Sequence, residues 1–332
     1  MMRAANAQAP AAYQLAADDQ QLRQVMAANI AAGYFSADCD PAVFYDKCAQ
    51  HRAVSQIDPG LAFSGQSLMS LDALPGDAGR TWVVRPSISP ASRGSALLLG
   101  LGGIDAPALA GAMQGVSGPF LLHEHEPGEP LFINGVFAQG QFIVSDAWHC
   151  YTLDLEGRRI LTAVTSLPTS RLPDGLVPRL AAVASGLGML HGPLHAEVVV
   201  TQHGPRLVKL SPRLASTPLP ELCRLGGWPS QEDSWRQLPR IGAGAEQPVA
   251  DYSFVVTRPG RVKAFRFDRE VRGLASFSHY FVAPPLGEYM AMTTDGTTYG
   301  CTVFLRHRSL AVLEEDIARL QALNLADAFE FD

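Results

Sequence analysis

The chain has 332 residues, of which 47% are hydrophobic, and a formal net charge of -6. This size and composition predict one large domain, or two closely packed subdomains, with a sizeable core. The negative charge excludes a broad basic surface for nucleic acid or an anionic membrane, so any anion site must be local.

The cysteines and the apolar runs indicate a cytoplasmic protein. Five cysteines occur without a C-x-x-C pair, which suits reduced thiols better than a disulfide framework. The longest apolar run, Ala96 to Leu101, is too short to cross a bilayer. We therefore expect no membrane segment.

The first 45 residues are expected to form a loose tail and one helix. Residues 1–20 are rich in Ala and Gln and lack the apolar run of a signal peptide. Residues 20–33 carry apolar side chains at helical spacing and end on Gly33, a common stop for a helix.

Two positively charged residues, Lys47 and Arg85, lie in the next part of the chain. Lys47 follows Asp46, and in isolation it would be an exposed helix lysine. Residues 82–86 (WVVRP) predict a buried strand that ends at Arg85. A hydroxyl-rich loop follows over residues 87–95 and contains Ser92 and Arg93, a composition that is also common in surface loops without a ligand.

Residues 119–128 (PFLLHEHEPG) predict an apolar strand that ends near Glu124. His123 and His125 stand at i and i+2, a spacing that can ligate zinc. No third ligand appears at a sensible spacing, so solvated or hydrogen-bonded histidines are the favoured interpretation.

Residues 132–151 predict a hairpin with Asn134-Gly135 and Gln139-Gly140 as turn signals. Residues 180–190 (LAAVASGLGML) predict an apolar helix that leads into a second hairpin.

The second hairpin carries charges. Its arms are His195 to Thr201 and Arg206 to Leu210, with a turn at residues 203–205 (HGP). A three-residue loop would place Glu197 opposite Ser211 and diagonal to Lys209 on one face. The alternative is a surface hairpin with a solvated Glu/Lys pair.

The remainder predicts loops, then strands and a helix. Residues 215–247 are rich in Pro, Gly and Trp, as around a pocket mouth, and Trp228 and Trp235 are either lining residues or packing groups. The expected strands are Phe254 to Val256, Val262 to Phe267, Tyr280 to Ala283 and Cys301 to Leu305, followed by a helix from Val312 to Leu323.

Together these stretches resemble the ATP-grasp ligases. The segment from His191 to Arg213, HGPLHAE followed by a hairpin and SPR, resembles the family's G-P-x-H-x-E, hairpin, E-I-N-P-R pattern. It departs from that pattern in two places, because Lys209 stands where the family has a second metal carboxylate and Ser211 where it has Asn. The D-K pair at Lys47 and the V-V-R-P stretch, V-V-K-P in the family, also match.

The resemblance implies an α+β protein with the ATP-grasp fold, in which two α+β lobes enclose a nucleotide site. Residues 46–250 would form the core, and residues 251–332 a small sheet-and-helix lobe that completes the domain. Residues 1–45 would be a tail and the remnant helix of an N-terminal domain that is otherwise missing.

The resemblance also implies a role for each candidate side chain. Lys47, Arg85, Ser92 and Arg93 would bind phosphates, Glu124 the adenine, Glu197 magnesium, and Arg213 the transferring phosphoryl group or a substrate carboxylate. Lys209 is expected to pair with Glu197 in the empty protein and to stand in for a metal ion at the γ-phosphoryl group. Because Lys209 and Ser211 replace metal ligands, magnesium is expected in a weak or single site.

The implied activity is that of a carboxylate-amine ligase, which uses ATP to form an acyl phosphate and then an amide or peptide bond. Its partners would be ATP, a small carboxylic acid or amino acid, and an amine, with no nucleic acid and no membrane. The rival is a non-catalytic nucleotide-binding or scaffolding protein derived from such a ligase. A homodimer is compatible with either.

Overall fold

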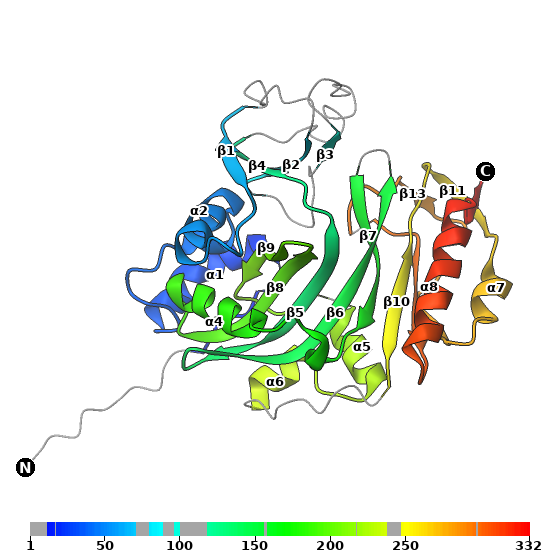
Figure 1. Cartoon of the computed structure of the whole chain (residues 1–332). Coiled ribbons are helices and arrows are strands. Elements are labelled where there is room, and N and C mark those ends of the chain that lie inside the picture. Colours follow the sequence, from blue (N-terminus) through cyan, green and yellow to red (C-terminus); the bar gives the residue numbers. More distant parts are fainter. Residues whose placement is uncertain are drawn as a thin grey trace, which may run out of the picture.

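Antiparallel sheets form the framework of the protein. The computed structural model describes residues 12–16, 18–70, 80–88, 96–99, 118–155, 158–216, 218–237, 247–296 and 298–332. Within these ranges there is an eight-stranded, a four-stranded and a three-stranded sheet. In Figure 1 the large sheet crosses the middle of the molecule, the four-stranded sheet stands above it, and the C-terminal helix lies beside β10. The α+β class expected from the sequence is confirmed.

Strand order within each sheet departs from chain order. The large sheet consists of β12 (Phe277–Val282), β14 (Cys301–Arg306), β10 (Val249–Phe254), β7 (Arg158–Ser166), β6 (Gln141–Leu155), β5 (Gly128–Ala138), β8 (His191–Thr201) and β9 (Gly204–Ser211). The four-stranded sheet consists of β1 (Gly65–Leu68), β4 (Phe120–Glu124), β2 (Thr81–Pro86) and β3 (Ala96–Leu99). The small sheet consists of β13 (Tyr289–Met290), β11 (Gly260–Phe265) and β15 (Phe329–Phe331).

The α-helices flank these sheets. They are α1 (Asp19–Ala31), α2 (Lys47–Ile57), α4 (Leu176–Gly186), α5 (Leu219–Gly226), α6 (Gln231–Gln237), α7 (Asp268–Arg272) and α8 (Leu310–Leu325). Two of them begin with an aspartate cap: Asp18 accepts from the Gln21 amide (2.8 Å) and Asp46 from the Ala49 amide (3.0 Å). Each cap satisfies an amide that the first helical turn leaves open.

Several predicted elements are confirmed with shifted ends. Helix α1 ends two residues before Gly33, whose φ of 82° favours a residue without a side chain. The apolar helix expected over residues 180–190 is α4, which begins and ends four residues earlier. In the C-terminal part β14 and α8 lie where expected, but β10 covers residues 249–254 instead of 254–256.

One of the two predicted turns between β5 and β6 is wrong. The chain turns at Gln139 and Gly140, both with positive φ (52° and 75°), as a tight hairpin requires. Asn134 and Gly135 instead lie inside β5, at a register shift. A Cβ at Gly135 would collide with the Ile143 carbonyl oxygen, so glycine is needed here for close approach of two strands.

Three apolar clusters hold the sheets and helices together. One lies between α1, α4 and strands β5, β8 and β9; a second lies between α8, β10, β14 and β11. The third contains Trp148 and Trp228, whose ring centroids are 6.1 Å apart. Trp228 is therefore a packing residue and not part of a pocket lining, whereas Trp235 is half-buried against Tyr13 and His191.

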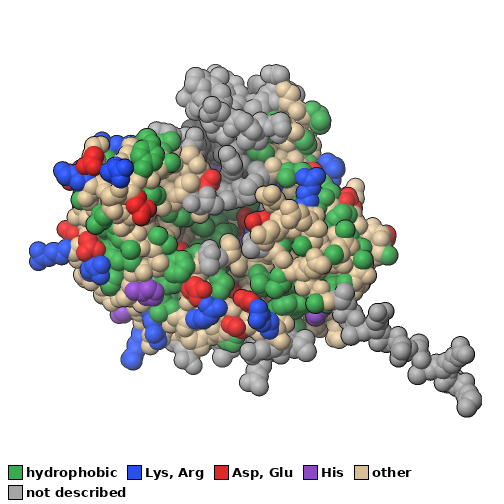
Figure 2. Space-filling model, turned by 180° about the vertical axis from the view of Figure 1, so that it is seen from behind, with side chains coloured by type: hydrophobic (Ala, Val, Ile, Leu, Met, Phe, Trp, Pro, Cys, Tyr) green, Lys and Arg blue, Asp and Glu red, His purple; other side chains and the backbone are tan. Residues whose placement is uncertain are grey.

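All five cysteines are free thiols, four of them buried. Among the described helices none is long and apolar enough to span a bilayer. Figure 2 shows the opposite face of the molecule with a hollow near its middle, where hydrophobic side chains gather and acidic and basic side chains stand around the edge.

Candidate functional site

The β8–β9 hairpin is present, but the predicted register is wrong. The loop has two residues, because Thr201 pairs with Gly204 and the Thr201 hydroxyl donates to the Gly204 carbonyl oxygen (2.9 Å). A register shift between Glu197 and Val198 then places Glu197 directly opposite Lys209. The sequence pattern did not reveal this bulge, and the consequence is a closer Glu197–Lys209 pairing than predicted.

A row of buried polar side chains crosses three neighbouring strands next to this pair. The Asn134 amide nitrogen donates to Asp146 Oδ1 (2.5 Å), and the Trp148 indole donates to the same oxygen (2.5 Å). The other end of the Asn134 amide must then present oxygen, which accepts from His195 Nδ1 (2.6 Å). The row fixes the orientation of the His195 ring.

His195 in turn faces Glu197. The distance from His195 Nε2 to Glu197 Oε1 is 3.6 Å. Burial and the Arg213 guanidinium lower the pKa of His195. Burial alone would raise the pKa of Glu197, but the His195 ring and the Lys209 ammonium lower it well below its usual range. Arg85 adds to this lowering, so Glu197 is ionised at neutral pH.

Four cationic side chains are buried in this part of the protein. Lys47 and Arg85 each expose 7% of their surface, and Lys209 and Arg213 each expose 9%. Lys47 begins α2, Arg85 lies near the end of β2, and the other two belong to β9 and the residues after it. Lys47 is therefore not the exposed helix lysine that its sequence context alone would predict. A buried cation requires anionic or hydrogen-bonding surroundings.

Lys47 and Arg85 meet in a cavity between the four-stranded sheet and the hairpin. The cavity has a volume of about 20 Å³ and is also lined by His51, Phe63 and Val208. Arg85 donates from Nη1 to the Val208 carbonyl oxygen (3.1 Å), at the bulge of β9. This space accommodates about one water molecule, so a phosphate enters only if the side chains or the four-stranded sheet move.

Glu124 lies on the other face of its strand. Arg85 pairs with Leu121, and Val83 with His123, so alternation places Glu124 away from the Arg85 side. Its carboxylate accepts from Arg80 Nη1 (3.0 Å) and is partly exposed. The assignment of Glu124 to adenine stays a prediction, and it requires the carboxylate to leave Arg80.

His123 occupies the Arg85 side instead. Its ring stacks on Phe63 (centroids 4.4 Å apart), and burial, together with the Arg85 charge, lowers the pKa of His123 to about 3. His125 contacts Arg159 through its Nε2 (3.2 Å). These contacts agree with the interpretation of hydrogen-bonded histidines.

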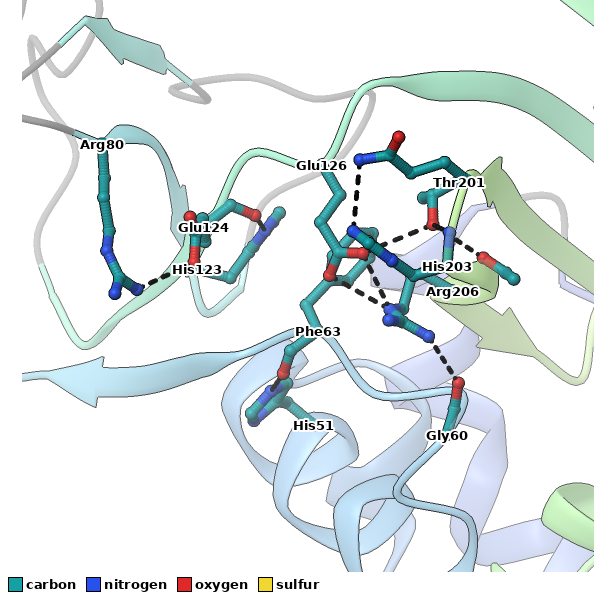
Figure 3. A network of polar contacts seen from close by, with 12 residues as sticks. His51, Gly60, Phe63, Arg80, His123, Glu124, Glu126, Thr201, His203 and Arg206 are labelled. Atoms are coloured by element: carbon teal, nitrogen blue, oxygen red, sulfur yellow. Dashed lines mark hydrogen bonds and ion pairs between the residues drawn. The ribbon is translucent and has the colours of Figure 1, made fainter.

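Sequence reasoning missed an ion pair that ties the segment between the two larger sheets to the hairpin. Arg206 Nε lies 3.0 and 3.1 Å from the two Glu126 carboxylate oxygens, and both side chains are largely buried. Arg206 also donates to the Gly60 carbonyl oxygen (2.8 Å), and Thr201 donates to Glu126 (3.4 Å). Figure 3 shows this network beside Phe63 and His51.

The remaining candidates lie after β9 or outside the described residues. Arg213 donates to the Leu214 carbonyl oxygen (2.8 Å), and the preceding Pro212 carbonyl accepts from the Tyr13 hydroxyl (2.7 Å). Ser211 is fully buried, and its hydroxyl has no hydrogen-bond partner among the described residues. Ser92 and Arg93 lie outside the described residues.

The donor set does not fit a carboxylate-bound magnesium site. Magnesium prefers octahedral oxygen ligands, often one or two carboxylates. Glu197 is a suitable ligand, but the position opposite it holds an ammonium at Lys209, and an ammonium has no lone pair to offer. Over the ranges that the structure describes, no group of three or more His, Cys, Asp or Glu side chains could hold a metal ion.

Comparison with known proteins identifies the fold. The chain has the ATP-grasp fold, as the sequence predicted. Similar solved structures include an L-amino acid ligase from Bacillus licheniformis, with a TM-score of 0.66 and 15% identity, over 88% of this chain and 73% of that chain.

Two further similar structures were solved with nucleotides. One is a carboxyaminoimidazole ribonucleotide synthase from Aspergillus clavatus complexed with ATP (TM-score 0.61, 12% identity, 86% of this chain and 74% of that chain). The other is the biotin carboxylase domain dimer of a 2-oxoglutarate carboxylase from Hydrogenobacter thermophilus, in complex with MgADP, ADP and bicarbonate (TM-score 0.59, 10% identity, 95% and 72%). No family model and no curated protein sequence matches the chain.

Proposed function

We propose that the protein is an ATP-dependent carboxylate-amine ligase. The observation that carries this proposal is the set of four buried cations, Lys47, Arg85, Lys209 and Arg213, on elements of both lobes of an ATP-grasp fold. Buried cations on converging elements are suited to a polyanion such as a nucleotide triphosphate. The L-amino acid ligase among the similar structures supports the same class of reaction.

The candidate residues would have two roles, to bind the nucleotide and to stabilise charge during the reaction. Lys47 and Arg85 would hold the phosphates, with Ser92 and Arg93, which follow Arg85 in the sequence, as further candidates. The base would lie along β4, and Glu124 would reach its amino group only after its carboxylate leaves Arg80 and turns toward the Arg85 side. Arg213 would hold the transferring phosphoryl group or the substrate carboxylate.

The reaction proceeds in two balanced steps. A carboxylate oxygen of the acid attacks the γ-phosphorus, ADP leaves with the electrons of the broken P–O bond, and an acyl phosphate forms. The amine nitrogen then forms a C–N bond to the acyl carbon, the C–O bond to phosphate breaks, and phosphate leaves with the electrons of that bond and takes up the proton that the nitrogen loses. Lys209 stabilises charge on the transferring phosphoryl group in this scheme.

Any magnesium binding would be weak, because Lys209 replaces one of the two expected carboxylates and leaves Glu197 as the remaining one. The protein is proposed to act in the cytoplasm, as five free thiols suggest. Its partners would be ATP, a small carboxylic acid or amino acid, and an amine.

The test is ADP release from ATP across a panel of carboxylic acids and amines. The expected result is release that requires both an acid and an amine, and that Arg213→Gln abolishes. Exposed Arg319 on α8 offers a matched control, because it pairs with Glu315 of the same helix, so that Arg319→Gln removes the same charge outside the site and leaves release unchanged. Intact ATP binding without release for any pair would instead favour a non-catalytic nucleotide-binding protein, because the replacement of metal ligands at Lys209 and Ser211 weakens activation of the phosphoryl group.

A further inference from the structure

The pairing of Glu197 with Lys209 gives the site an unusual charge arrangement. The two residues face each other across β8 and β9 at the bulge of the hairpin. Lys209 is buried, and the Glu197 side chain is about a quarter exposed (26%). On its other side Glu197 meets the His195 ring, which the Asn134–Asp146 row holds in place. Glu197 thus lies beside the His195 ring and within the electrostatic influence of the Lys209 ammonium.

The surroundings of Glu197 are rich in positive charge. Lys209 and Arg85 both lower the pKa of Glu197, and Arg213 acts on the adjacent His195. Arg85 also shares the small cavity with Lys47. Each of the four buried cations therefore lies within electrostatic range of the hairpin or of another of these cations. The hairpin also holds one ionised carboxylate, that of Glu197.

A divalent cation would be poorly accommodated here. It would have to approach Glu197 against the repulsion of a buried ammonium, and two like charges at close range in a protein interior repel strongly. The residue opposite His195 is Ser211, whose buried hydroxyl is a weak neutral ligand. The described residues offer no larger ligand group.

We propose that this site binds the nucleotide as the metal-free polyanion, with the ammonium of Lys209, the strand partner of Glu197, supplying the positive charge at the phosphates. This inference rests on the proposed function, because it concerns the same nucleotide site. An ammonium donates up to three hydrogen bonds to phosphate oxygens and needs no coordination shell. Free ATP also carries two more negative charges than its magnesium complex, which suits a part of the protein that holds four buried cations.

The experiment is calorimetric titration of the wild-type protein with ATP, once with EDTA and once with excess magnesium chloride. The expected affinity for ATP is about tenfold higher in EDTA, a difference that corresponds to one charge pair in partly buried surroundings. Adenosine is the matched ligand control, because it has no phosphates and its binding should not respond to magnesium. An ATP affinity that falls about tenfold in EDTA overturns the inference and leaves the proposed function standing.

Two variants sharpen the result. Lys209→Glu with Ser211→Asn restores two oxygen ligands, and this double variant should bind ATP only when magnesium is present. Lys209→Gln should bind ATP more weakly than wild type in EDTA, and an unchanged affinity would contradict the role of the ammonium. The wild-type comparison stands alone if the double variant fails to fold. Absence of ATP binding under both conditions would overturn the proposed function itself.

Discussion

Replacement of Arg85 tests whether the buried cations bind phosphate. Arg85 is almost fully buried, and its Nη1 lies 3.1 Å from the Val208 carbonyl oxygen, beside the cavity that it shares with Lys47. A hydrogen bond to a charged group contributes about 1.5 to 3 kcal/mol, so Arg85→Ala should weaken ATP binding by about 10- to 150-fold. Arg85→Lys keeps the charge and should lose much less.

The assay is calorimetry with ATP and with adenosine on the same protein preparations. Adenosine affinity should change little in Arg85→Ala, because adenosine has no phosphate to lose. Equal losses for both ligands would refute the phosphate role and would indicate that Arg85 mainly supports the strand through Val208. Thermal unfolding of each variant separates loss of binding from loss of the fold.

Three further predictions concern other parts of the chain. Glu124→Ala should weaken binding of both ATP and adenosine, whereas Arg80→Ala, which frees the Glu124 carboxylate, should not; unchanged affinity in Glu124→Ala removes Glu124 from the site. Burial raises the pKa of Asp251 from its usual value to about 7, so the folded protein binds the proton more tightly and stability falls as pH rises from about 4 to about 7. Asp251→Asn should therefore stabilise the protein at pH 8 by up to about 4 kcal/mol and by less at pH 5, as measured by denaturant unfolding, and a pH-independent difference would contradict this. Gln231 bonds three backbone carbonyls and one backbone amide in the interior, so Gln231→Met should destabilise the fold by about 2 to 4 kcal/mol, and an unchanged denaturation midpoint would show that these groups find other partners.

Local patterns in the sequence predicted the strands and helices well. The β-branched run of β8 and the apolar stretch before Arg85 both form the expected strands. The apolar spacing of residues 20–33 and 312–323 predicted α1 and α8. These elements depend on periodicity and on capping residues, which a sequence displays directly.

The register and the polar row could not be predicted in the same way. Asn134-Gly135 has the composition of a turn, but Asn134 is buried and its amide links His195 to Asp146. The bulge beside Glu197 depends on how β8 and β9 pack against other parts of the chain. A local sequence pattern does not contain this information. Tertiary contacts between distant segments decided both.

The ion pair of Glu126 with Arg206 was missed for a similar reason. Eighty positions separate the two residues, and each by itself reads as an ordinary surface charge. Only the assembled fold shows that they lie together with the Gly60 carbonyl.

The central claim is that a nucleotide binds between the lobes, against the buried cations. A crystal structure of the protein soaked with ATP and magnesium tests it most directly. We expect the triphosphate beside Lys47 and Arg85, the base along β4, and the Lys209 ammonium at the phosphates. A nucleotide bound elsewhere on the protein, or no bound nucleotide at millimolar ATP, would contradict the claim.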